Sequence, residues 1–134
     1  MNVNARRLII VGALLGFLGV ALGAFGAHAL KTRIEPELMA AYQTGVQYHL
    51  AHALGVLLVG ALVQVLSPLP SSSKTLSWLV TSGWLMVAGV ILFSGSLYAL
   101  ALSGMRTLGI VTPLGGVALL MAWLSLAFGV AKIR

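Results

Sequence analysis

Residues 8–30 read LIIVGALLGFLGVALGAFGAHAL, a run of 23 residues without a charged side chain. A helix of about 20 residues rises roughly 30 Å, which is the thickness of the hydrocarbon core of a bilayer. Three further uncharged stretches follow at residues 46–66, 76–103 and 113–131. The sequence therefore predicts an all-α fold: an integral membrane four-helix bundle with up-down-up-down topology, forming one polytopic membrane domain over residues 1–134.

The charged residues support this prediction by their positions. The chain has eight Lys or Arg and two acidic residues, a net charge of +6, and all ten charges lie outside the four stretches. A charge at the bilayer centre costs at least a few kcal/mol, so spanning helices exclude it. The basic residues stand singly or in pairs at the ends of the stretches, which favours contact with anionic lipid headgroups and argues against nucleic-acid binding.

Four spans place both termini on one side of the membrane. The positive-inside rule compares the Lys and Arg residues of the two sides. The side of the termini carries five of them and the other side three, which favours cytoplasmic termini. The first apolar run exceeds the roughly 7–15 residues of a signal-peptide core, so we expect it to be retained as the first span. The five are Arg6, Arg7, Lys74, Lys132 and Arg134, and the three are Lys31, Arg33 and Arg106.

Small residues recur at heptad-like spacing in the first and fourth stretches, where they predict helix-packing faces. Because lipid gives no hydrophobic drive for helix association, close backbone approach must supply it. We expect the first and fourth spans to pack together through these faces and so close the bundle; a homodimer through the same groove is the competing interpretation. The residues are Gly12, Gly16, Gly19, Gly23 and Gly26 in the first stretch, and Gly115, Ala118, Ala122, Ser125 and Gly129 in the fourth.

Polar side chains are expected to gather at one membrane face, because alternating helices bring the end of each odd span beside the start of the next even span. The opposite half of the bundle is expected to be almost wholly aliphatic. Thr112, followed by Pro113, is also expected to cap the fourth helix. The candidate polar cluster consists of His28, His52, Ser94, Ser96, Tyr98 and Thr112.

The sequence lacks residue types that several kinds of catalysis, metal binding and transport require. The chain has no cysteine and no aspartate, so a Ser-His-Asp triad and cysteine-ligated metals are ruled out. No carboxylate lies within a stretch to serve a proton-coupled transport path. His28, His49 and His52 could together ligate a metal, but a hydrogen-bonded polar network is the preferred interpretation. We therefore expect no enzymatic activity, no catalytic residue, no bound metal and no cofactor.

Several motifs in order resemble a known family across essentially the whole chain. They are GAFGAH (23–28), QTG (43–45), LFSGSLY (92–98) and TPLGG (112–116). Together they resemble the domain of unknown function 423 family, also called uncharacterised protein family 0382. The resemblance implies four spans and residence in a bacterial inner membrane, and it brings no established activity. The family pattern matches this chain at His28 and His52, whereas His49 is less typical of it.

These observations favour a non-catalytic scaffold or accessory subunit whose polar cluster lies at one membrane face. Its expected partners are the lipid bilayer and either another membrane protein or further copies of the chain, with no nucleic acid. One alternative is a small oligomeric transporter or channel that uses the cluster as a vestibule. A second alternative is a haem- or metal-binding membrane protein that uses His28 and His52.

Overall fold

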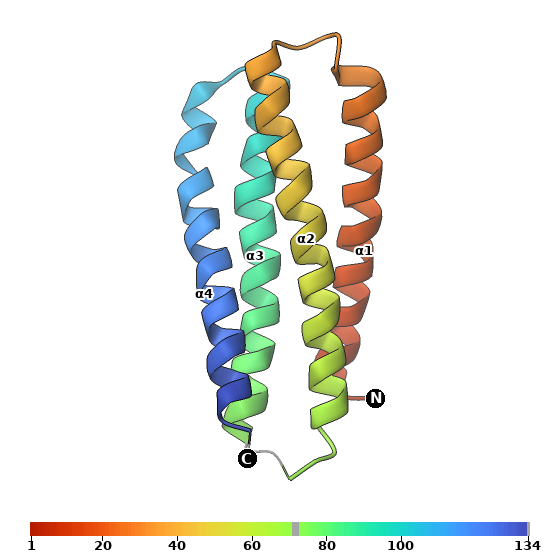
Figure 1. The fold of residues 1–134 in the computed structure, drawn as a ribbon, viewed down its shortest axis with the longest axis vertical. Coiled ribbons are helices and arrows are strands. Elements are labelled where there is room, and N and C mark those ends of the chain that lie inside the picture. Colours follow the sequence, from red (N-terminus) through yellow and green to blue (C-terminus); the bar gives the residue numbers. More distant parts are fainter. Residues whose placement is uncertain (71–72, 134) are drawn as a thin grey trace.

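The computed structural model describes residues 1–70 and 73–133. Within these residues the chain forms four long helices that alternate in direction (Figure 1). All four are long and apolar enough to cross a membrane, which confirms the predicted all-α membrane bundle. The helices are α1 (Val3–Phe25), α2 (Pro36–Leu66), α3 (Ser73–Ser103) and α4 (Thr112–Ala131), with a π-helical turn η1 (Gly26–Leu30) after α1 and a 3-10 turn η2 (Arg106–Ile110) before α4.

Each of the first three helices begins before its uncharged stretch. The Oδ1 atom of Asn2 accepts hydrogen bonds from the backbone nitrogens of Asn4 (2.9 Å) and Ala5 (3.3 Å), and so caps α1 near the start of the chain. Pro36 occupies the first turn of α2, where its missing N–H costs nothing. The helices therefore extend beyond the hydrocarbon core into the headgroup layers. Arg134, used above to infer the orientation, lies outside the described residues.

The order of the helices across the bundle differs from the expectation. Figure 1 shows α2 and α3 in the middle, α1 beside α2, and α4 beside α3, and the extensive contacts are between these sequence neighbours. The predicted packing of the first span against the fourth is therefore wrong. Short connections keep consecutive helices adjacent, and a groove of small residues is filled by large side chains of a neighbour, not by a second groove.

The glycine faces identify these neighbours directly. A methyl group added at Gly12 would lie 2.9 Å from Cγ of Leu57, and one at Gly19 would lie 2.6 Å from Cδ2 of Leu50, both on α2. A methyl group added at Gly129 would lie 3.1 Å from Cβ of Trp78 on α3. The face on α1 thus packs on α2, and the face on α4 packs on α3.

The larger of two apolar core clusters lies in the half of the bundle that contains the start of α1, and all four helices contribute to it. Gly83 on α3 admits the side chain of Leu8, which brings α1 into contact with α3 at this level. These side chains pack against one another and form a tightly packed interior. Its buried members are Ala5, Leu8, Val56, Val59, Val63, Leu79, Met86 and Ala122.

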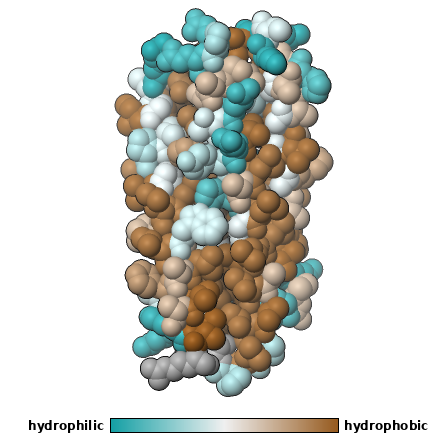
Figure 2. All heavy atoms as spheres, in the orientation of Figure 1, coloured by the Kyte–Doolittle hydropathy of each residue, from teal (hydrophilic) through white to brown (hydrophobic). Residues whose placement is uncertain are grey.

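Hydrophilic residues cover both ends of the molecule, and on the face in Figure 2 they descend further from the upper end, where α1 finishes and α2 begins. The lower half is not wholly aliphatic inside, contrary to expectation, because Thr75, Ser82 and Ser125 are buried there. Ser82 donates from Oγ to the carbonyl oxygen of Ala122 at 2.8 Å. A small hydroxyl that bonds to a helix carbonyl is tolerated in an apolar interface, so the lower half accommodates it.

Candidate functional site

His52 lies near the middle of α2 and is only 6% exposed. Its Nδ1 atom is 2.7 Å from the carbonyl oxygen of Tyr48, and its Nε2 atom is 3.1 Å from Nε1 of Trp123 on α4. A carbonyl only accepts and an indole N–H only donates, so the imidazole carries its proton on Nδ1 and is neutral. Both ring nitrogens are therefore used inside the bundle.

The His52–Trp123 pair forms one wall of a groove on the outside of the bundle, with a volume of about 380 Å³. Tyr48 and Phe93 form another part of the wall, with ring centroids 4.5 Å apart. Trp123 is 45% exposed and Tyr48 44% exposed, so the groove opens toward lipid. Gly116, Leu119 and Leu120 of α4 complete the lining.

A second polar set joins α1, α2 and α3 closer to the upper end. His49 is buried, and its Nδ1 atom is 3.0 Å from the hydroxyl oxygen of Tyr98. Tyr42 packs against Tyr98 with ring centroids 5.1 Å apart and donates its hydroxyl to the carbonyl oxygen of Leu22 at 2.5 Å. A methyl group at Gly26 would overlap the Tyr42 ring, so this glycine at the start of η1 makes room for this set.

A third set joins α3 to α4 at the upper end. The hydroxyl groups of Ser96 and Thr112 are 2.7 Å apart, and Ser96 also donates to the carbonyl oxygen of Phe93 at 2.9 Å. Thr112 is not the helix cap that the sequence predicts. It is the first residue of α4, Val111 holds the capping position, and the threonine hydroxyl bonds to Ser96 instead.

The six predicted cluster residues thus lie at one end and in the middle of the bundle, divided among separate contacts. Ser94 is fully buried, and its Oγ atom has no hydrogen-bond partner. His28 is exposed in the turn η1. Gly26 lies beside Tyr42, which precedes His52 on α2, and His28 lies beyond Gly26 toward the upper end. Counted along the helices from this contact, His28 is about 12 residues, or about 18 Å of helix, above the level of His52.

Metal binding by His28 and His52 does not fit this geometry, because zinc and copper bonds to imidazole are only about 2 Å long. Among the described residues, no group of three His, Cys, Asp or Glu side chains could hold a metal ion. The bonds of His52 to Tyr48 and Trp123 also leave that imidazole without a free nitrogen.

His49, Tyr42 and Trp123 are central to these contacts, although the predicted cluster does not contain them. The seven-residue spacing of Tyr42 and His49 places both on one face of a helix, which is a signal in the sequence. Trp123 lies in the middle of the fourth stretch, away from the interfaces where tryptophan is enriched. A tryptophan at this depth needs a hydrogen-bond acceptor, and His52 supplies it.

The four apolar helices and their buried polar pairs define a small polytopic membrane protein. The family described as "Protein of unknown function (DUF423)" matches residues 22–116. UPF0382 membrane protein YwdK of Bacillus subtilis is 45% identical to the chain, over 95% of the chain and 98% of that relative. UPF0382 inner membrane protein YgdD of Escherichia coli is 37% identical, over 98% of the chain and 94% of that relative.

A third relative, UPF0382 membrane protein SSP2132 of Staphylococcus saprophyticus, is 38% identical over 96% of the chain and 99% of its own length. The chain therefore belongs to the DUF423 family, also named UPF0382, as the sequence motifs predict. No solved structure matches the chain.

Proposed function

We propose that this protein is a non-catalytic accessory subunit or scaffold of the bacterial inner membrane, which binds a spanning helix of a partner protein. The observation that carries the proposal is the environment of His52. Both of its ring nitrogens bond within the bundle, and the indole that it holds forms a wall of an outward-facing groove. In this proposal the polar groups of the groove shape a surface for the partner helix.

The chemistry of the groove suits a transmembrane helix. Association in lipid depends on close packing and on interhelical hydrogen bonds, because lipid tails are as apolar as the helices. Gly116 provides a small residue at which a partner backbone can approach, and Tyr48, which also lines the groove, carries a hydroxyl group for a polar contact. Trp123 and Phe93 supply rigid aromatic surface of the kind that dominates interface energetics.

The packing at mid-height supports this function over transport through a single copy. A methyl group at Gly55 would lie 2.9 Å from the sulfur atom of Met86, so α2 and α3 are in close contact there. Val56, Met86 and Ala122 are fully buried at this level. A transport path would need polar groups across this layer.

The relatives support the proposed membrane, and the distribution of charge supports the proposed orientation of the termini. The Escherichia coli relative is named an inner membrane protein, which supports the same membrane for this chain. The excess of Lys and Arg on the side of the termini supports cytoplasmic termini.

The test is affinity purification from native membranes in mild detergent, with wild-type protein compared with Leu120→Trp and Leu124→Trp. Leu120 lines the groove, whereas Leu124 is exposed on the same helix outside the lining. We expect one stoichiometric membrane-protein companion, retained by Leu124→Trp and lost by Leu120→Trp. Purification of the chain without a companion, or a companion retained equally by both variants, would contradict the proposal.

A further inference from the structure

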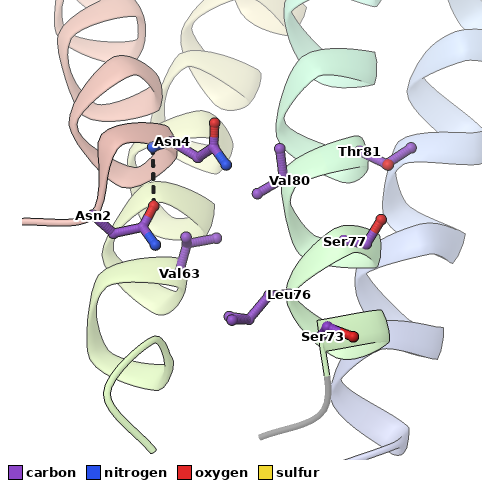
Figure 3. Close-up of a pocket in the computed structure, with 8 residues that line it drawn as sticks. All are labelled: Asn2, Asn4, Val63, Ser73, Leu76, Ser77, Val80 and Thr81. Carbon is purple, nitrogen blue, oxygen red and sulfur yellow. Dashed lines mark hydrogen bonds between the residues drawn. The ribbon is translucent and has the colours of Figure 1, made fainter.

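Two glutamine side chains of α2, Gln43 and Gln47, are exposed in the upper half of the bundle. Neither side chain has a hydrogen-bond partner among the described residues. The other carboxamide side chains of the chain lie at the lower end, where Asn2 caps α1 (Figure 3) and Gln64 accepts a hydrogen bond of 2.9 Å from the backbone nitrogen of Asn2. Gln43 and Gln47 therefore need a partner that this copy of the chain does not supply.

The depth of Gln47 in the bilayer follows from the packing of α1 on α2. The charge-free run 8–30 has its midpoint at Gly19, and a methyl group at Gly19 would lie 2.6 Å from Cδ2 of Leu50. Leu50 therefore marks the middle of the hydrocarbon core, and Gln47, three residues before it, is about 5 Å from that level. Water does not reach this depth, so the carboxamide of Gln47 is stabilised only by hydrogen bonds to protein.

Gln47 belongs to a row of exposed residues along α2, which we call the α2 seam. Its members follow one another at intervals of four, three, four, three and four residues, the rhythm of two parallel helices in a left-handed pair. The residues next to Gln47 in the row are small, so the backbone of a second helix can approach closely. The α2 seam consists of Ala40, Thr44, Gln47, Ala51, Leu54 and Leu58.

The surface beside the α2 seam is also open to a neighbour. Gln43 and Gln47 border a groove of about 190 Å³, whose wall on the side of α1 contains Gly23, Gly26 and Ala27. These residues have little or no side chain, so the groove leaves room for the large side chains of a second helix. The carboxamides and the space beside them therefore lie on one outward surface.

We propose that a second copy of this chain packs on the α2 seam and forms a dimer with its two-fold axis along the membrane normal. Both copies insert in the same direction, so the two α2 helices run parallel. On such an axis each residue of the seam faces its own counterpart. A carboxamide both donates and accepts, so Gln47 of one copy bonds to Gln47 of the other. This self-complementarity favours a second copy over an unrelated helix or a lipid chain.

The dimer goes beyond the proposed accessory function and uses a different surface. Tyr48, His52 and Trp123 line the aromatic groove and are not members of the α2 seam. A single polar residue in a seam of this kind fixes the register of the two helices, which is the role that Gln47 has here.

Disulfide cross-linking in native membranes tests the interface, because the chain has no cysteine of its own. Ala51→Cys places a thiol in the α2 seam, and Val20→Cys is the control on the exposed face of α1 at a similar depth. Under mild oxidation we expect a covalent dimer from Ala51→Cys and none from Val20→Cys. Absence of the Ala51→Cys dimer, its adduct with another protein, or equal dimer yields from both variants would overturn the proposal.

Sedimentation equilibrium of the purified chain in density-matched micelles tests the carboxamide pair. Gln47→Leu should weaken dimerisation at least about fivefold, because it removes the interhelical hydrogen bonds. Gln47→Asn keeps the carboxamide and should retain most of the dimer. Gln47 is exposed, so neither substitution disturbs the core of one copy, which thermal unfolding checks. Equal dimerisation of Gln47→Leu and the wild type, or equal losses in the two variants, would contradict the proposed bond.

The variant Leu120→Trp separates this dimer from the proposed accessory function. Leu120 lines the aromatic groove and is not part of the α2 seam, so this variant should dimerise as the wild type does. Loss of the dimer in Leu120→Trp would show that the second copy binds in the aromatic groove, and the α2 seam would be refuted as the interface.

Discussion

At the residue scale, the buried hydroxyl groups of α3 differ in whether they find an acceptor. Ser82 and Ser94 are both fully buried on this helix. Ser82 donates to the carbonyl oxygen of Ala122, whereas the Oγ atom of Ser94 has no partner. A buried polar group without a partner costs free energy, and a hydrogen-bonded one contributes a modest stabilisation.

This difference predicts opposite effects of two identical substitutions. Ser82→Ala should lower the free energy of unfolding by about 0.5–1.5 kcal/mol, because it removes a hydrogen bond inside the bundle. Ser94→Ala should leave stability unchanged or raise it, because it removes an unpaired hydroxyl. Reversible unfolding in mixed detergent micelles measures both values. A loss at Ser94 equal to that at Ser82 would reveal a partner for Ser94 and refute the prediction.

At the element scale, adjacent glycines on α4 have different roles. A methyl group at Gly115 would overlap the backbone of Phe93 on α3, with Cα only 2.7 Å away. A methyl group at Gly116 would meet nothing closer than the Phe93 ring at 3.8 Å. Gly115 therefore sets the distance between α3 and α4, and Gly116 does not.

Gly115→Ala should destabilise the protein by at least about 1–3 kcal/mol, because the backbone of α3 must move away. Gly116→Ala is the matched control and should change stability by less than about 0.5 kcal/mol. Thermal unfolding in one detergent compares the two variants. Equal stability of Gly115→Ala and the wild type would show that α3 and α4 are not in this close contact.

The glycine face of α1 allows a similar comparison between folding and dimerisation. Gly19 is buried against Leu50 of α2, whereas a methyl group at Gly16 would have no neighbour within 4 Å. Gly19→Leu should therefore destabilise the bundle by separating α1 from α2. Gly16→Leu should leave the unfolding midpoint unchanged. If Gly19→Leu alters only the dimer fraction in sedimentation, the groove serves association between copies and the intramolecular contact is refuted.

At the scale of the whole molecule, the alternating helices place both termini at one end of the bundle (Figure 1). The chain contains no cysteine, so single-cysteine variants can be labelled without background. With cytoplasmic termini, Arg33→Cys and Arg106→Cys should react with an impermeant maleimide in intact cells or spheroplasts. Asn4→Cys and Lys132→Cys should react only after lysis. The reverse pattern would refute the inferred orientation.

The sequence determined the parts of this structure that depend on one helix at a time. Because the bilayer penalises each charge locally and a helix satisfies its own backbone, charge-free runs such as residues 8–30 identify the four spans and their alternating directions. The same argument predicts that Tyr98, Ser96 and Thr112 share one end, and the structure brings the last two into hydrogen-bond contact.

Only the tertiary structure decided which helices are neighbours and which polar groups pair. A small-residue face such as that of α1 fits any helix with suitable large side chains, so spacing alone did not distinguish α2 from α4 as its neighbour. The pairing of His52 with Trp123 joins residues 71 positions apart and depends on the rotation of two helices about their axes. Side-chain packing across the interface determines that rotation, and a linear pattern does not contain it.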